Sequence, residues 1–172
     1  MSTPIIIHIS GAKWSKNTLK CIKVVKKEVK IVLFGGYQHN IDKKGRVFIP
    51  AKLRDELGEE FIVCRGIAGK RCLCVYSTEE WNNLVEQIST LPNTKSSAVK
   101  RFLYDGAFNV EFDAQGRILI PATLREYACL EDAAHIIGMN TNLEIWNKEL
   151  WQKENSDYTP ESIAAIVNEL DF

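Results

Sequence analysis

A nine-residue stretch that occurs twice constrains the fold of this chain more than any other feature. Residues 42–50 read DKKGRVFIP and residues 113–121 read DAQGRILIP, and the match continues without a gap for four further residues. A second matching pair, VYSTEEW and IWNKELW, follows each copy. Repetition at this spacing indicates that the chain carries one supersecondary unit twice.

Each copy predicts the same order of elements. A strand leads into the D-x-x-G segment, a short β-branched strand follows, and a proline at helix position N1 opens a short helix. Two more strands complete the unit. In the first copy the strands are predicted at 37–41, 46–49, 61–65 and 72–76 with the helix at 51–57, and in the second copy the strands are predicted at 107–112, 117–120, 135–138 and 143–146 with the helix at 122–128.

The D-x-x-G segment is predicted to be a tight turn. The short Asp side chain can accept hydrogen bonds from turn amides, and the Gly reaches a positive φ without a Cβ penalty. The Arg that follows stands four residues after the Asp, so the two side chains are placed to pair. The residues of this structural motif are Asp42, Gly45, Asp113, Gly116 and Arg117. For Arg46 we expect base or phosphate contact, and the pair with Asp42 is the alternative.

Helices are predicted outside the two copies. Ser77 to Glu80 has the spacing of a capping box, and apolar residues follow it at helical spacing. Residues 97–104 predict a second helix, and Thr159-Pro160 predicts the start of a third one with an apolar stripe at 163, 166, 167 and 170. We expect all three stripes to join the core of the chain, with a partner-binding groove as the alternative.

The charge is zero overall but unevenly distributed. Residues 1–31 carry seven lysines and one acid, residues 34–76 have a net charge of +3, and residues 105–146 have a net charge of −5. DNA carries one negative charge per roughly 1.7 Å of its axis, so the first copy is the better contact surface for it. Lys43 and Lys44 lie at the first turn, whereas Ala114 and Gln115 replace them at the second.

A two-stranded ribbon can enter a major groove, where Arg can pair with guanine through two hydrogen bonds. The candidate DNA-binding residues are Lys43, Lys44, Arg46, Lys52 and Arg54. For Arg54, an ion pair with Asp55 or with a neighbouring chain remains open beside phosphate contact.

The sequence predicts no catalytic and no metal site. The three histidines lack a nucleophile pattern, and the Arg beside each repeated Asp would keep that carboxylate ionised. Five cysteines, with Cys72 and Cys74 two residues apart, do not match the usual zinc spacing and indicate reduced thiols in a cytosol. Neither a signal peptide nor a membrane span is expected.

Three motifs extend over about Leu33–Trp151: G-Y-x-H-N-I-D-x-K-G-R-V-x-I-P-A-K-L-R, the second D-x-x-G-R-x-x-I-P-A-x-L-R and the E-x-W after each copy. Together they resemble the MraZ family of bacterial transcriptional regulators. Half of the motif also resembles the AbrB/SpoVT swapped-hairpin family. The resemblance implies a mainly β fold with α additions, in which two β-hairpin repeats form an intramolecular pseudo-dimeric barrel with short helices.

The same resemblance implies a function. We expect a protein of the cytoplasm and nucleoid that assembles into a ring-shaped homo-oligomer and uses no cofactor. It would bind direct repeats in double-stranded DNA near its own promoter, in the division and cell-wall gene cluster. The alternative is an antitoxin-like module that binds a protein partner with the same fold.

The predicted domains follow the repeats. They are a basic extension (1–32), the first repeat (33–76), a helical connector (77–104), the second repeat (105–148) and a C-terminal helical segment (149–172). MraZ proteins usually begin near the position of Phe34, so we expect translation to start at Val32. The alternative is a genuine basic tail that attracts phosphates without sequence preference.

Overall fold

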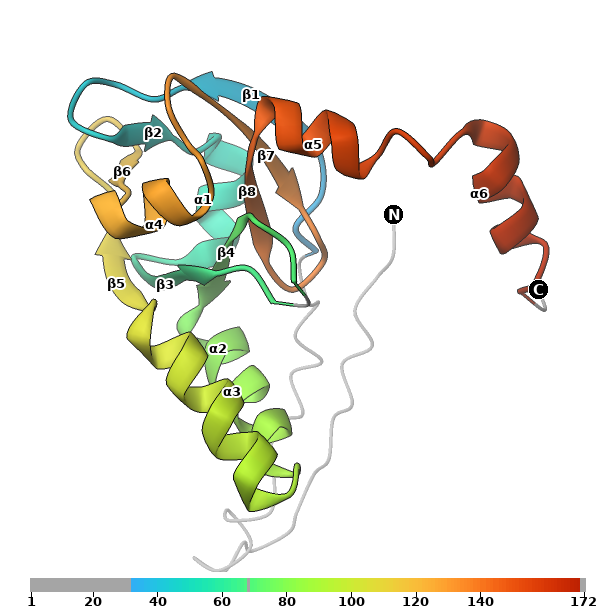
Figure 1. The fold of residues 1–172 in the computed structure, drawn as a ribbon. Coiled ribbons are helices and arrows are strands. Elements are labelled where there is room, and N and C mark those ends of the chain that lie inside the picture. The colour runs from blue at the N-terminus through green and yellow to red at the C-terminus, as the bar shows by residue number, and fades with distance from the viewer. Residues whose placement is uncertain (1–31, 68, 171–172) are drawn as a thin grey trace, which may run out of the picture. The chain divides into compact units, whose positions relative to one another are not determined.

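The two copies of the repeat fold into the same succession of elements in the computed structural model, which describes residues 32–67 and 69–170 (Figure 1). The predicted basic extension, with its two alternative origins, lies outside these residues except for Val32. The elements in chain order are β1 (Gly36–Asn40), β2 (Arg46–Phe48), α1 (Ala51–Leu57), β3 (Glu60–Arg65), β4 (Leu73–Ser77), α2 (Thr78–Ser89), α3 (Asn93–Asp105), β5 (Phe108–Glu111), β6 (Arg117–Leu119), α4 (Ala122–Tyr127), β7 (Ala133–Gly138), β8 (Leu143–Asn147), α5 (Lys148–Glu154) and α6 (Pro160–Val167).

The strands form one six-stranded sheet, in the order β1-β7-β8-β4-β3-β5, and a separate two-stranded ribbon, β2-β6. Every pairing is antiparallel. Exchanging the two copies reverses the strand order of the sheet and leaves the ribbon unchanged, so the topology has a pseudo-twofold axis. The closed barrel that we expected does not form over the described residues, because β1 and β5 remain free edges of the sheet.

The strand before each D-x-x-G turn pairs with the other copy. β1 lies beside β7, and β5 lies beside β3. The hairpin expected within the first copy is reduced to one bridge, Ile41 to Val47, because β2 leaves its own copy to pair with β6. The copies are therefore interlocked, as the swapped-hairpin resemblance implies.

Side chains alternate between the two faces of the sheet, as the pleat requires. Phe61 and Val63 of β3 belong to an apolar cluster that also includes buried residues of the ribbon, α1 and α4. Ile62 and Cys64 belong to a second cluster, which includes residues of α2, α3 and α5. The sheet is thus covered on both faces, and the ribbon lies on the side of the first cluster.

Two of the three predicted stripes contribute to the core. Ser77 caps α2, where its Oγ accepts a hydrogen bond from the amide of Glu80 at 3.2 Å, and Trp81 and Ile88 are buried. In α3, Leu103 is fully buried. Pro50 and Pro121 differ from the prediction, because each is the N-cap of its helix and not its first residue.

The third stripe does not join the core, so the expectation was wrong for α6. This helix buries no residue, and the exposed fractions are 43% for Ile163 and 53% for Ile166. Leu170, which lies just beyond the end of the helix, is 58% exposed. Apolar residues at helical spacing indicate only that one face of the helix needs an apolar partner. Within the described ranges, no helix has the length and apolar character needed to cross a bilayer.

Candidate nucleic-acid interface

The first D-x-x-G turn has the geometry that its sequence predicts. Oδ1 of Asp42 accepts hydrogen bonds from the amides of Lys44 at 2.9 Å and Arg46 at 3.0 Å. The amide of Gly45 donates to the carbonyl of Asp42 at 2.8 Å, and Gly45 has a φ of 81°. A non-glycine residue is strained at such a φ, so the aspartate and the glycine together define this turn.

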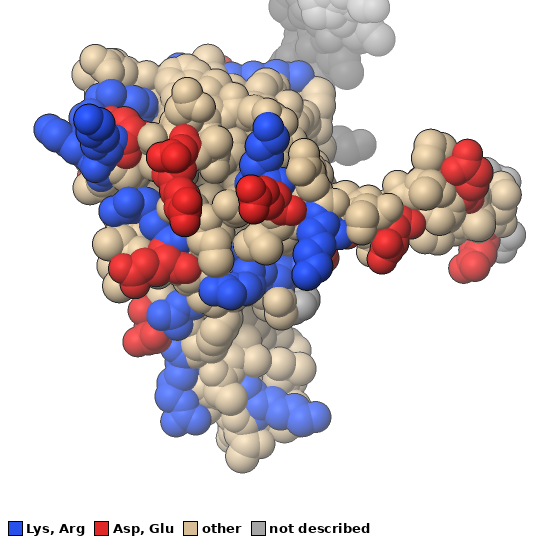
Figure 2. Space-filling view, turned by 45° about the horizontal axis from the view of Figure 1, so that its top comes forward, with Lys and Arg blue, Asp and Glu red and all other residues tan. Residues whose placement is uncertain are grey.

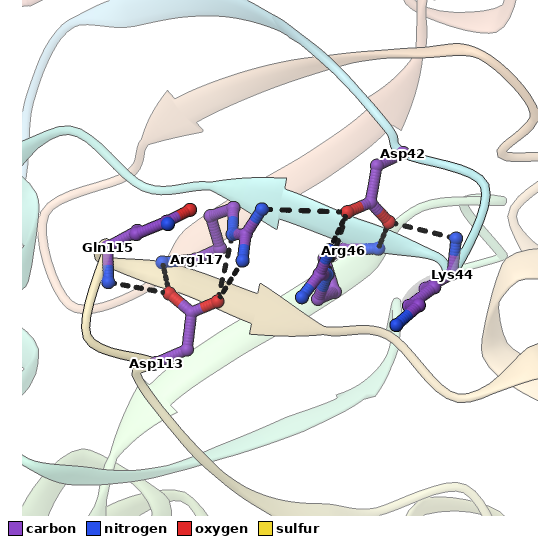
Figure 3. Close-up of polar contacts among 6 residues, drawn as sticks. All are labelled: Asp42, Lys44, Arg46, Asp113, Gln115 and Arg117. Carbon is purple, nitrogen blue, oxygen red and sulfur yellow. Dashed lines mark hydrogen bonds and ion pairs between the residues drawn. The ribbon is translucent and has the colours of Figure 1, made fainter.

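The second turn repeats this geometry closely. Oδ1 of Asp113 accepts from the amides of Gln115 and Arg117, both at 2.9 Å, and Gly116 has a φ of 75°. The two turns lie at opposite ends of the β2-β6 ribbon (Figure 3). The chain therefore offers two nearly identical backbone frames with different side chains on them.

The arginine after each turn pairs with the aspartate of the same turn (Figure 3). Arg46 reaches Oδ2 of Asp42 through Nε at 2.7 Å and Nη2 at 2.6 Å, and Arg117 reaches Oδ2 of Asp113 at 2.8 and 2.7 Å. Nη1 of Arg117 also lies 3.7 Å from Asp42. Hydrogen bonds from these arginines are the main cause that lowers the pKa of each carboxyl group to about 2. The predicted ion pairs are present, and base contact by Arg46 stays a prediction.

A second pair of arginines crosses between the copies. The guanidinium of Arg54, on α1, lies against Gly116 of the second turn, so that a Cβ built on this glycine would be 2.5 Å from Nη1. Arg125, on α4, lies in the same way against Gly45, where a Cβ would be 2.6 Å from Nε. Each glycine is thus required for two reasons, its φ and the close approach of the other copy's arginine.

Arg54 is held mainly by packing. Its guanidinium carbon is 5.6 Å from the ring centroid of Phe48 and 5.9 Å from that of Phe112, and its Nε is buried without a hydrogen-bond partner. Within the described part of the chain, no ion pair links it to Asp55. Its place between the copies suits a packing role, and phosphate contact by Arg54 stays a prediction.

The three lysines predicted to bind DNA are exposed. Lys43 and Lys44 are exposed at the turn, and the side chain of Lys44 extends away from the Asp42 carboxylate in Figure 3. Lys52, on α1, places Nζ 3.7 Å from the ring centroid of Phe34. Figure 2 shows Lys and Arg side chains gathered at the end of the body that carries the β1–β2 turn. The matched residues of the second turn, Ala114 and Gln115, are exposed and uncharged.

Two apolar residues that lie beside these cations were not predicted as site residues from the sequence. Phe34 is 55% exposed under Lys52, and Leu119 is 56% exposed directly opposite Arg46 in the ribbon. The alternation of R-I-L indicates that Leu119 points away from the core, because Ile118 between Arg117 and Leu119 is buried. The partner of Leu119 across the ribbon is set by strand pairing and has no local signal.

Comparison with known proteins places both copies in one family. The family described as "MraZ protein, putative antitoxin-like" matches residues 32–101 and 103–170. The transcriptional regulator MraZ of Thermoanaerobacter sp. (strain X514) is 49% identical, over 82% of this chain and 100% of that protein. The corresponding proteins of Acetivibrio thermocellus and Halothermothrix orenii are 48% and 42% identical, over 77% and 81% of this chain and 94% and 99% of theirs.

One solved structure, the solution structure of PHS018 from Pyrococcus horikoshii, matches 69% of this chain and 99% of its own at 13% identity with a TM-score of 0.30, which is too low for an inference about the fold. The family match has no such weakness, because it spans both repeats and the curated relatives align over nearly their full length. The chain therefore belongs to the MraZ family.

Proposed function

We propose that this protein is a transcriptional regulator that binds double-stranded DNA in a sequence-specific manner through the turn of its first repeat. The relatives named as transcriptional regulators support the general role. One observation supports the assignment to the first repeat. The two turns share their hydrogen bonds and their glycine φ, yet only the first carries exposed lysines.

The matched turns separate folding from binding. Because Asp, Gly and Arg make the same hydrogen bonds within the turn in both copies, those residues account for the turn itself. Lys43 and Lys44 add nothing to that geometry beyond the Lys44 amide, which Gln115 supplies equally well in the second turn. Two exposed cations at a rigid turn are suited to phosphate contact. Arg46 is proposed to contact a guanine edge, and Lys52 and Arg54 are proposed to contact flanking phosphates.

The proposed assembly is a ring-shaped homo-oligomer that binds direct repeats near its own promoter, in the division and cell-wall gene cluster, within the cytoplasm and nucleoid. A first repeat with a charge of only +3 binds weakly by itself. Several first repeats in one ring gain affinity for successive DNA repeats through effective concentration. The exposed apolar face of α6 supports a contact between subunits, because an apolar face of this kind usually marks an interface.

The test is titration of labelled DNA from upstream of the protein's own gene over a series of salt concentrations. The informative variant is Lys43→Ala with Lys44→Gln, which gives the first turn the side chains of the second. Each lost phosphate contact reduces the slope of log K against log salt by about 1 per chain, so the expected reduction is about 2 per bound chain. The control, Lys95→Ala with Lys100→Ala, removes the same charge from α3.

If the turn variant keeps the wild-type salt slope, or if the control variant shows an equally large reduction of the slope, the assignment to this turn is contradicted.

The binding of direct repeats is tested separately, with DNA that contains one copy of the repeat or several copies. Equal affinity for both contradicts the multivalent ring. Native mass spectrometry of Ile166→Glu, with Ala165→Glu on the opposite face of α6 as the control, reports whether α6 joins the subunits. If Ile166→Glu forms an oligomer with the same number of subunits as the wild type, α6 does not join the subunits.

The second candidate is an antitoxin-like module that holds a protein partner. The family description and the acidic second repeat favour it, and so does a hollow of about 420 Å³ at the β5 edge, lined by Phe108, Val110 and Leu119 among others. Two results together would favour this module over a DNA-binding regulator. The protein would not bind DNA even at low salt, and it would bind a protein partner with an affinity that does not fall as salt is added.

A further inference from the structure

Three side chains with metal-binding chemistry meet on the face of the sheet opposite the ribbon. The sulfur atoms of Cys72 and Cys74 and a carboxylate oxygen of Glu144 all lie within 4.8 Å of one another. The two thiols are nearly inaccessible, with residue exposures of 1% and 4%. The group is remote in sequence from the D-x-x-G turns, and the proposed DNA contact does not use it.

Strand pairing creates this cluster. Cys72 and Cys74 are two residues apart at the start of β4 and share a face, and Cys74 lies directly opposite Glu144 of β8. On the other side of β4, Cys64 of β3 lies directly opposite Cys74. Three neighbouring strands therefore present Cys64, Cys74 and Glu144 in one row, with Cys72 one step along the same face.

Over the described ranges, the Glu144 carboxylate has one hydrogen-bond donor and no ion pair. One of its oxygens accepts a hydrogen bond from the indole N–H of Trp146 at 2.9 Å. Among the described residues no cation pairs with it, since Lys70 pairs with Glu154 at 4.0 Å. The carboxylate and the two buried thiols therefore present three ligand atoms to one cation, and buried charges are generally paired or coordinate metals.

We propose that Cys72, Cys74 and Glu144 form a structural Zn²⁺ site, for which Cys64, opposite Cys74 on the neighbouring strand, is the candidate fourth ligand. Zinc takes tetrahedral sets of thiolate and carboxylate ligands, with bonds of roughly 2.3 Å to sulfur and about 2.1 Å to oxygen. Such bonds hold the ligand atoms about 4 Å apart or less, so small side-chain rotations bring the three groups to one ion. Each thiol that binds releases one proton to solvent.

The surroundings are those of a closed site. A Cβ added to Gly66 would be 2.7 Å from Sγ of Cys72, so the backbone of the β3–β4 connection lies directly against this sulfur. The indole N–H of Trp146 fixes the orientation of Glu144, as groups behind a metal ligand commonly do. Structural zinc sites have no open coordination position, and zinc here would join β4 to β8 where the two copies meet.

No metal site was predicted from the sequence, because the spacing of the cysteines along the chain does not indicate one. C-x-C is an unusual zinc spacing, and the third ligand lies seventy residues beyond Cys74. Only the β4–β8 register brings Glu144 to the two thiols. The structure thus leads to the opposite expectation.

The test is zinc binding to the reduced full-length protein after chelator treatment and desalting. Zinc content is measured by elemental mass spectrometry, affinity by competition with a chromophoric chelator, and coordination by the thiolate-to-metal absorption of the Co²⁺ form. We expect one zinc ion per chain. Cys72→Ser and Cys74→Ser should lose it, and Cys64→Ser should bind it more weakly. Cys129→Ser is the matched control, and Cys21→Ser removes the remaining thiol, which lies outside the described residues.

Glu144→Gln decides the question if a serine variant fails to fold, because glutamine keeps the shape and an acceptor for Trp146. Circular dichroism confirms its fold, and its zinc affinity should fall at least tenfold. Folded, reduced wild-type protein that takes up no zinc overturns the proposal. Wild-type affinity in Glu144→Gln, or in a folded Cys72→Ser variant, overturns it as well. Loss of DNA binding leaves this result unaffected, so the two proposals fail independently.

Discussion

Substitution of Gly116 by alanine tests the interlock between the two copies. The substitution has two separable costs. Alanine at a φ of 75° is strained, and its Cβ would stand 2.5 Å from Nη1 of Arg54. Gly69 provides the matched control, since its φ is 78° and no atom lies within 4 Å of a Cβ built there. Gly69→Ala therefore measures the backbone cost alone, and the difference between the two variants measures the displacement of Arg54.

The magnitudes follow from the geometry. A left-handed conformation costs an alanine roughly 1–2 kcal/mol, and the loss of backbone freedom in the unfolded chain returns about 0.4–1 kcal/mol. Gly69→Ala should therefore lower the free energy of unfolding by about 1 kcal/mol. Gly116→Ala must also move the guanidinium from the rings of Phe48 and Phe112, contacts worth about 0.5–1 kcal/mol each. Its expected total is about 2–3 kcal/mol.

Thermal and urea denaturation of the purified variants measure both effects. For a protein of this size, 1 kcal/mol corresponds to a shift of about 2–4 °C in Tm, so the two variants should be clearly resolved. Gly45→Ala repeats the experiment at the other turn, where a Cβ meets Arg125. Equal losses for Gly116→Ala and Gly69→Ala would refute the interlock, since they would show that Arg54 moves aside at no cost.

Three other predictions concern protonation and helix capping. The pKa values of Asp42 and Asp113 are lowered from 3.8 to about 2, so their contribution to stability is complete above about pH 4 and is lost as the pH falls from 3.8 toward 2. In the double variant Asp42→Asn with Asp113→Asn, the free energy of unfolding should therefore depend less on pH in that range, as measured by denaturation at a series of acid pH values. Burial lowers the pKa of His135, which stacks on a tryptophan ring at 4.5 Å, so urea denaturation should show stability falling as the pH drops below 6.5, and His135→Phe should remove that dependence. Ser77→Ala should cost about 1 kcal/mol in global unfolding, whereas Thr159→Ala, which removes the cap of the exposed α6, should leave the global transition unchanged.

The local parts of this structure were predictable because their causes are local. Asp42 and Gly45 define a turn through contacts within five residues, and the glycine φ follows directly from that turn. The bounds of α1 were predicted correctly for the same reason, since a proline precedes the helix and Gly58 follows it. The Arg–Asp pairs also required only the four-residue spacing.

The pairing of strands had no such signal. Two copies of one unit offer each strand two partners, its own copy and the other one, and local sequence does not say which of them it joins. The pairing of β1 with β7, of β2 with β6 and of β4 with β8 sets the contacts that cross between copies. Contacts of Arg54 with Gly116, and of Cys74 with Glu144, therefore emerge only from the three-dimensional structure.

The apolar stripe of α6 shows a different limit. Its apolar residues have the same spacing as those of α2, yet Trp81 and Ile88 of α2 are buried, whereas α6 has no buried residue. Periodicity reports which face is apolar and does not report whether the partner belongs to the same chain. The exposed stripe is thus consistent with the alternative that the sequence left open, a partner outside the chain.

The ion pairs of the turns bear on how the first repeat can contact DNA. Nε and Nη2 of Arg46 both point at Oδ2 of Asp42, so one edge of its guanidinium is already occupied. Bidentate contact with guanine requires two free N–H groups on one edge, which leaves the edge formed by Nη1 and Nη2. Arg117 has the same pairing at a turn without lysines, so the pairing itself gives no preference for DNA. The difference between the copies therefore rests on Lys43 and Lys44, whose ammonium groups carry charge that the turn does not consume.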